Sequence, residues 1–240
     1  MRTKFFVGAA ALLAVAAFAA QESAKVEWKP EVGKTSKYKI AVAANIDAGG
    51  QKMDMNFAMH HTAKVTKVEG GKVVVEIAAD AFSLMVNGED MTQMMGDQKY
   101  NSTTTFNANG EPLESKSDSP SEARQERLEN AFAFYYPNKE VKVGEAWGRK
   151  VKGDAAKSTV DAEATYTLEA VETVGEAKNL RIGFTYKETA GDTPMTGAGT
   201  VWLTASVGEL VKGTYSMKNV QFDASMPPTD ATATVTRIDK

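Results

Sequence analysis

The chain has 240 residues, of which 42% are hydrophobic and 25% are charged, a composition typical of a globular protein. It contains no Cys, which excludes disulfide bonds, thiolate zinc sites, a Cys nucleophile and a lipid-modified Cys. Its two His residues leave little material for acid–base or metal chemistry, and a net charge of -3 disfavours nucleic-acid binding. We therefore expect no cofactor, no metal and no nucleic-acid partner.

The first 19 residues have the pattern of a secretory signal peptide. Arg2 and Lys4 precede an uncharged stretch, residues 5–18, that is rich in Ala, Leu and Val. Ala17 and Ala19 place small residues at the two positions that matter for cleavage, so cleavage after Ala19 is predicted. The stretch is shorter than the ~20 residues of a transmembrane helix. The pattern predicts an exported protein, periplasmic or secreted, with no transmembrane span in the mature chain.

Long alternating strands are predicted after this leader. Apolar side chains recur at every second position, a period typical of strands, over residues 38–46, 53–65 and 73–79. Gly-rich or Asn-Gly segments that favour hairpin turns separate them, at residues 47–50, 70–71, 87–88 and 109–110. Each strand would bury one face and expose the other, which favours an antiparallel sheet.

One segment has the pattern of a helix. Residues 119–122 combine a capping Ser, a Pro suited to the first helical position and a Glu that can close a capping box. An apolar stripe with spacings of four and three residues follows, formed by Leu128, Phe132 and Tyr135. We predict a helix over about 120–135 that Pro137 ends, with the charged run 124–129 as its solvated face.

The second half of the chain repeats the alternation. Its predicted strands cover residues 160–170, 180–186, 200–204, 211–222 and 231–238. Because similar Val-Gly turns precede the first strand of each half, the halves resemble a degenerate repeat. The predicted divisions are a signal peptide at 1–19, a first β repeat at 20–118, a helix segment at 119–137 and a second β repeat at 138–240. One continuous domain over 20–240 is the alternative.

A single helix cannot cover the apolar faces of so many strands. The sheet must therefore curve around the helix or pack against a second sheet. We expect a mostly β fold, in which long antiparallel strands form a curved sheet, a half-barrel or open barrel, with the helix on its concave side. Two packed sheets are the alternative. A concave face that side chains do not fill would leave an apolar cavity.

The clearest chemical pattern is a group of Met and His side chains on one face of the strand 53–65. Thioethers and imidazoles bind Cu(I), but neighbours on one strand face lie ~6.6 Å apart, too far to share an ion without a partner strand. Adaptable packing by Met is therefore favoured over copper binding. A Met-rich surface also suits an apolar ligand. The candidate ligand-binding residues are Met53, Met55, Phe57, Met59 and Phe132.

Two short motifs support a resemblance to a known family. Residues 51–57 read Gln-Lys-Met-Asp-Met-Asn-Phe, and residues 141–147 read Val-Lys-Val-Gly-Glu-Ala-Trp. Both resemble motifs of an uncharacterised family of bacterial exported proteins, often attached as lipoproteins, in which Asp is usual at the position of Glu145. The layout is also similar to the half-barrel of periplasmic lipoprotein carriers. The resemblance implies an envelope protein, although this chain lacks the Cys that a lipid anchor requires.

The sequence leaves two functions open. The first is an exported, non-catalytic envelope protein that binds an apolar ligand, such as a lipid, or a lipidated partner on a concave sheet. The alternative is a structural or interaction β module with a filled core and no small-molecule site. Adjacent residues on a strand point to opposite faces, so His60 and His61 cannot share one catalytic site, and no enzymatic activity is expected.

Overall fold

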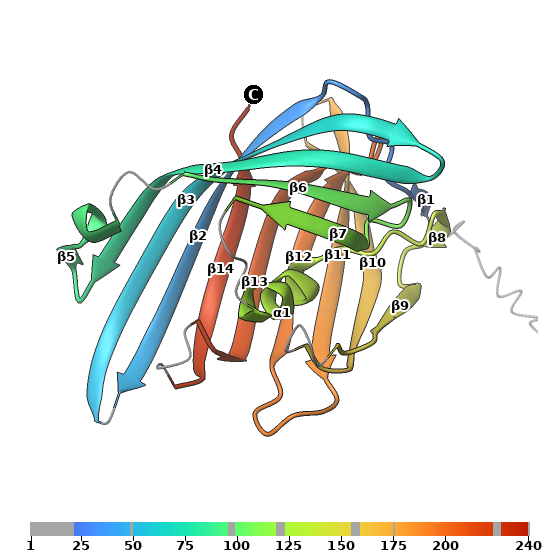
Figure 1. Ribbon diagram of the computed structural model, residues 1–240. Helices are drawn as coiled ribbons and strands as arrows, with labels where there is room; N and C mark the ends of the chain where they lie inside the picture. Colours follow the sequence, from blue (N-terminus) through green and yellow to red (C-terminus); the bar gives the residue numbers. More distant parts are fainter. Residues whose placement is uncertain are drawn as a thin grey trace, which may run out of the picture.

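The computed structural model describes most of the chain after the predicted signal peptide, which lies outside it (Figure 1). The described residues are 22–48, 50–95, 99–118, 123–154, 159–174, 176–222 and 227–239. The predicted helix cap at 119–122 also lies outside them. Within the described ranges, no helix has both the length and the apolar character needed to cross a membrane.

The described chain forms one large antiparallel sheet of 12 strands and a small sheet of two. The order in the large sheet is β7-β6-β4-β3-β2-β14-β13-β12-β11-β10-β9, and β5 pairs with β4. Its strands are β2 (Thr35–Ala48), β3 (Gln51–Glu69), β4 (Lys72–Val86), β5 (Glu89–Asp90), β6 (Tyr100–Asn107), β7 (Pro112–Ser117), β9 (Ala146–Val151), β10 (Ala162–Val174), β11 (Ala177–Glu188), β12 (Thr196–Thr204), β13 (Leu210–Val220) and β14 (Thr229–Arg237). The small sheet pairs β1 (Ser23–Val26) with β8 (Lys139–Lys142).

The large sheet is curved and open, as the alternating pattern predicts. Figure 1 shows the β3–β4 hairpin at the top of the molecule, with β6 and β7 below it and above α1, while β14 to β9 continue to the right. The helix α1 (Ala123–Phe132) lies inside the curve, against the concave side. The edge strands β7 and β9 do not pair with each other, so the sheet is not closed into a barrel. The mostly β half-barrel prediction is confirmed.

The predicted hairpin turns connect neighbouring strands of the sheet. At the β3–β4 turn, Gly70 and Gly71 both have positive φ, 57° and 73°. At the β4–β5 turn, Asn87 and Gly88 have φ of 50° and 83°. Two consecutive positive φ values define the turn type that matches the twist of antiparallel strands, and Asn and Gly adopt them at the least steric cost.

The two halves of the chain share one sheet. The C-terminal strand β14 lies between β13 and β2, with Ala233 opposite Val42 and Val235 opposite Ile40. The first half therefore contributes one side of the sheet and the second half the other, joined along the β2–β14 ladder. A duplication of the two halves remains a prediction, since this pairing is compatible with one continuous domain.

The helix ends three residues earlier than predicted, at Phe132. The carbonyl groups that follow accept hydrogen bonds from side chains of the sheet: Tyr166 donates to the Ala133 oxygen (2.9 Å) and Trp147 to the Tyr135 oxygen (2.9 Å). Because Pro137 follows Tyr136, that residue also favours an extended backbone over a helical one. The prediction that the helix reaches Tyr135 is therefore wrong.

The main core lies between α1 and the concave side of β9–β13. Its most buried members include Leu168, Leu180, Ile182 and Leu203, each no more than 1% exposed. A smaller cluster, formed by Val65 of β3 with Val73 and Val75 of β4, packs beside Trp28 and Phe106. Aromatic rings link the helix segment to the sheet, since Phe134 lies 5.0 Å from Tyr166 and 4.7 Å from Tyr136 between ring centroids.

Candidate functional site

Four of the five candidate residues share one surface on the concave side of β3. Met53, Met55, Phe57 and Met59 alternate with more exposed residues along the strand. Their neighbours in register are Ile46, Ala44, Val42 and Ile40 on β2, with Leu84 and Val86 on β4. We call this set, from Met53 to Met59 with its neighbours on β2 and β4, the methionine face.

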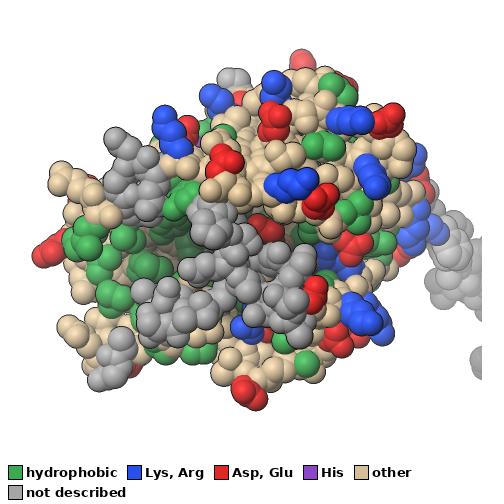
Figure 2. Space-filling model, viewed as in Figure 1, with side chains coloured by type: hydrophobic (Ala, Val, Ile, Leu, Met, Phe, Trp, Pro, Cys, Tyr) green, Lys and Arg blue, Asp and Glu red, His purple; other side chains and the backbone are tan. Residues whose placement is uncertain are grey.

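The β3 row of the methionine face is less buried than the core beside it. Its Met and Phe side chains are half-buried, whereas Leu180 of β11 is 1% exposed, and the β2 members Ile46 and Ala44 are also buried, at 2% and 3% exposed. Of the four candidate side chains on β3, Met55 packs against the main core cluster. Figure 2 shows hydrophobic side chains gathered at the end of the molecule that β3, β4 and β5 form. The helix therefore covers the β9–β13 side of the sheet more fully than the β2–β4 side.

The fifth candidate, Phe132, lies apart from the other four. It belongs to α1 and packs edge-on against Tyr215 of β13, with ring centroids 4.9 Å apart. In register, Tyr215 pairs with Ala233, Ala233 with Val42 and Val42 with Phe57. At ~4.8 Å per strand, Phe57 is about 14 Å from Tyr215. Ala233 of β14 thus lies between the Phe132–Tyr215 ring pair and the methionine face.

The structure adds aromatic residues that the sequence pattern did not indicate. Phe82 of β4 lies 6.0 Å from Phe57 and 5.4 Å from Tyr100 of β6, measured between ring centroids. A bulge interrupts the pairing of β3 with β4 at this point, and Ala81 has a φ of 50°. Because a bulge shifts the alternation by one residue, the period of two does not assign Phe82 to this face. In the sequence, the alternation of the strand breaks at Asp80-Ala81-Phe82, and this break is the feature that could have indicated the bulge.

The methionine face ends, after Met59, at a row of polar side chains. His61 follows Met59 on the same face of β3, Tyr38 stands opposite it on β2, and Arg237 stands opposite Tyr38 on β14. Burial lowers the pKa of His61 and raises that of Tyr38, in each case by disfavouring the charged form. Both side chains are therefore uncharged near neutral pH.

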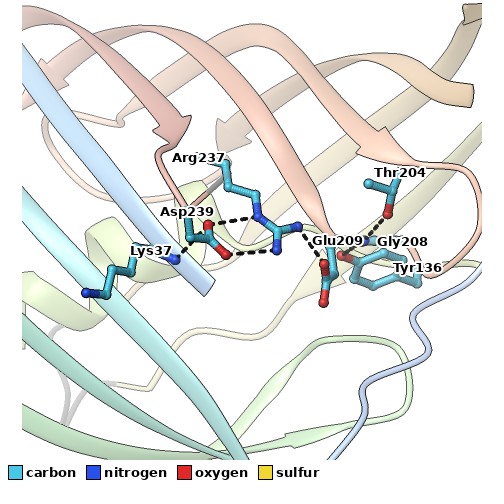
Figure 3. A network of polar contacts seen from close by, with 7 residues as sticks. All are labelled: Lys37, Tyr136, Thr204, Gly208, Glu209, Arg237 and Asp239. Carbon is cyan, nitrogen blue, oxygen red and sulfur yellow. Dashed lines mark hydrogen bonds and ion pairs between the residues drawn. The ribbon is translucent and has the colours of Figure 1, made fainter. Parts of the chain in front are cut away.

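Arg237 belongs to a network of ion pairs (Figure 3). Its guanidinium donates to both oxygens of Asp239, at 2.9 and 3.0 Å, and to Glu209 at 2.6 Å. The pairing with Arg237 lowers the pKa of Asp239. Nearby, the Tyr136 hydroxyl donates to the Gly208 carbonyl at 2.7 Å. The network fixes the C-terminal end of the chain to the β13 end of the sheet.

A second ion pair joins α1 to the sheet. Arg127 donates through Nε and Nη2 to the carboxylate of Glu188, each at 2.5 Å, and the Glu188 side chain is fully buried. The Met195 backbone N–H donates to the same carboxylate. The prediction that the run 124–129 is simply the solvated face of the helix is therefore wrong at Arg127, which pairs with a buried carboxylate 61 residues away.

The described residues do not support a metal site. No group of three His, Asp or Glu side chains among them is placed to hold an ion. The residues opposite Met53, Met55 and Met59 on β2 are Ile46, Ala44 and Ile40, which carry only hydrocarbon side chains. The partner strand that a Cu(I) site would need therefore supplies no sulfur or imidazole directly across from these thioethers.

Two open hollows lie on the convex side of the same sheet. One, of about 250 Å³, is lined mainly by small or polar side chains, including Ala41, Asn56 and Thr232. The other, of about 480 Å³, has a polar lining that includes Lys64, Glu76 and Asp118. Phe57 and Val42 of the methionine face also line the first hollow, whereas Met53, Met55 and Met59 line neither. Substitutions in these hollows can therefore serve as controls for substitutions on the concave side.

Comparisons with known proteins yield only distant likenesses. No family model and no curated protein matches the chain. A provisionally assigned lipoprotein of Parabacteroides distasonis is 11% identical with a TM-score of 0.29, over 89% of this chain and 97% of its own. DynF, from the dynemicin biosynthesis pathway of Micromonospora chersina, is 8% identical with a TM-score of 0.25, over 88% and 84% of the two chains. A DUF1329 family protein of Desulfovibrio piger is 9% identical with a TM-score of 0.24, over 87% and 85%.

TM-scores of 0.24–0.29 are too low to transfer a function, so the function rests on this chain's own residues.

Proposed function

We propose that this chain is an exported, non-catalytic protein that binds an elongated apolar ligand, of the class of a lipid acyl chain, on the methionine face. The supporting observation is the half-buried row of Met53, Met55, Phe57 and Met59, which lies on the same concave side as the packed core but is less buried than that core. A contiguous apolar surface that the core leaves partly uncovered is a candidate binding site.

The side chains of the methionine face suit a ligand of variable shape. Met is unbranched and polarizable, so a Met-rich surface can adapt to different occupants. Burial of a methylene group contributes ~0.8 kcal/mol, so eight methylenes would supply about 6 kcal/mol before the entropic costs of binding. This gain is sufficient for a measurable affinity, and it needs no charged group within the face.

Binding is tested with N-phenyl-1-naphthylamine, an uncharged probe whose fluorescence increases in apolar sites. We expect the delipidated protein to bind the probe, and Met59→Arg to weaken this binding at least tenfold, because a charge placed on the face must be desolvated by the ligand. Asn56→Arg is the matched control, since Asn56 lies on the same strand and lines the convex hollow, which Met59 does not.

If Asn56→Arg weakens probe binding and Met59→Arg does not, the binding site is the convex hollow and the proposal is wrong. If the wild type binds no probe, the filled β module without a small-molecule site becomes the better description.

Export is tested separately on protein recovered from the cell envelope or the medium. Cleavage after Ala19 predicts a mature N-terminus at Ala20, because the small residues Ala17 and Ala19 precede that bond. N-terminal sequencing checks this directly. Recovery of a chain that still begins at Met1 would contradict the assignment of residues 1–19 as a signal peptide.

A further inference from the structure

The methionine face has one polar end. Along β3, each inward-facing residue from Met53 to Met59 is apolar, and the next residue on that face is His61. His61 lies in register with Tyr38 on one side and Ala79 on the other. Beyond Ala79, Tyr100 continues the row on β6. One register row that crosses the concave side therefore carries hydroxyl and imidazole groups, and it borders the apolar rows.

His61 and Tyr38 can both form hydrogen bonds without carrying a charge. Burial is the only cause of the lowered pKa of His61, so no neighbouring charge or hydrogen bond among the described residues stabilises its protonated form. Burial is also the main cause of the raised pKa of Tyr38. Opposite residues of an antiparallel pair have Cβ atoms ~5 Å apart, so these two side chains can contact the same small group.

The charge at this end disfavours an anion. Arg237, which stands beside Tyr38, is already bound by the carboxylates of Glu209 and Asp239. Figure 3 shows its guanidinium between these two acidic groups. One cation and two anions leave the network with a net negative charge. A carboxylate or phosphate arriving here would meet no free cation in this network and would be repelled by the surplus carboxylate.

We propose that the ligand is an amphiphile with an uncharged, hydroxyl-bearing headgroup, which His61 and Tyr38 bind while its acyl chain lies along the methionine face. This inference rests on the function proposed above and adds the class of headgroup. The distance fits: eight residues separate His61 from Met53, roughly 26 Å along an extended strand. A lipid chain spans about half of a ~30 Å bilayer core, so one acyl chain fits within this length.

The headgroup is tested by competition of two lipids with bound N-phenyl-1-naphthylamine. Monooleoylglycerol and oleate carry the same acyl chain but differ in headgroup charge at about pH 8, where the carboxyl group is ionised. We expect monooleoylglycerol to displace the probe at concentrations at least tenfold lower than oleate. If oleate competes equally well or better, the headgroup assignment is wrong and the proposed function stands. If the wild type binds neither the probe nor either lipid, the proposed function itself fails.

The role of His61 is tested against His60, the other His of the chain. His60 is exposed and points to the opposite face of β3, which makes His60→Leu a matched control. We expect His61→Leu to weaken monooleoylglycerol binding about five- to tenfold, the effect of losing one hydrogen bond to a buried partner. Probe binding should be unchanged in both variants, because the probe makes no use of the polar row.

NMR provides a readout that does not depend on a substitution. With two imidazoles in the chain, the ring signals are assigned by the two Leu variants. Monooleoylglycerol should shift the His61 signals and leave those of His60 in place. Tyr38→Phe, which removes only a hydroxyl, should weaken the same lipid without altering probe binding. Unchanged His61 signals in the lipid-bound protein would overturn the placement of the headgroup.

Discussion

Replacing Phe132 with Ala is expected to lower the free energy of unfolding by about 3 kcal/mol, the lower end of the range for truncating a packed Phe. Phe132 is half-buried and contacts the Tyr215 ring edge-on at 4.9 Å. It forms the last residue of α1, the helix that covers the concave side of the sheet. A loss of this size should lower the melting temperature by roughly 6–12 °C for a chain of this length.

The control is Ser216→Ala, since Ser216 follows Tyr215 on β13 and its side chain is exposed. Exposed substitutions of this kind usually change stability by less than ~0.5 kcal/mol. Thermal unfolding followed by circular dichroism compares the two variants. Equal melting temperatures for Phe132→Ala, Ser216→Ala and the wild type would mean that α1 is an exposed connector rather than a packed cover.

The second large effect concerns the ion pair that joins α1 to β11. Arg127→Leu should lower the free energy of unfolding by about 3–5 kcal/mol, because it leaves the carboxylate of Glu188 buried without its cation. The Glu188 side chain is 0% exposed, and after the substitution the Met195 N–H remains as a donor to it. Urea unfolding at neutral pH measures the loss.

One further measurement separates this cause from general damage to the helix. The double variant Arg127→Leu/Glu188→Leu should regain most of the lost stability, as apolar replacements of buried ion pairs commonly do. A double variant less stable than Arg127→Leu alone would contradict this account of the ion pair.

The sequence predicts the local features of this fold well because they repeat with a short period. Alternation along residues 53–59 assigns the candidate side chains to one face, and the register with β2 places them there. Gly70-Gly71 and Asn87-Gly88 mark turns because few other residues adopt their φ values. These signals depend on residues close together in sequence.

The features that the sequence pattern missed depend on distant partners. Arg127 looks like any charged residue of a solvated helix face until the fold brings Glu188 to it. The end of α1 at Phe132 depends on hydrogen bonds from Trp147 and Tyr166, which lie on other strands. Tyr38 appears in the pattern only as an ordinary strand residue, and His61 only as part of the Met and His group of one strand, because the polar row exists only once β2, β3 and β14 are in register.

The central claim, that the methionine face binds an apolar chain, is tested most directly by native mass spectrometry of protein purified from its own compartment without detergent. The account predicts a protein peak with an added mass that matches a neutral acyl lipid, and loss of that mass in Met59→Arg but not in Asn56→Arg. A clean apo mass for the wild type, with no binding of added monooleoylglycerol, would contradict it and favour a β module whose concave side needs no ligand.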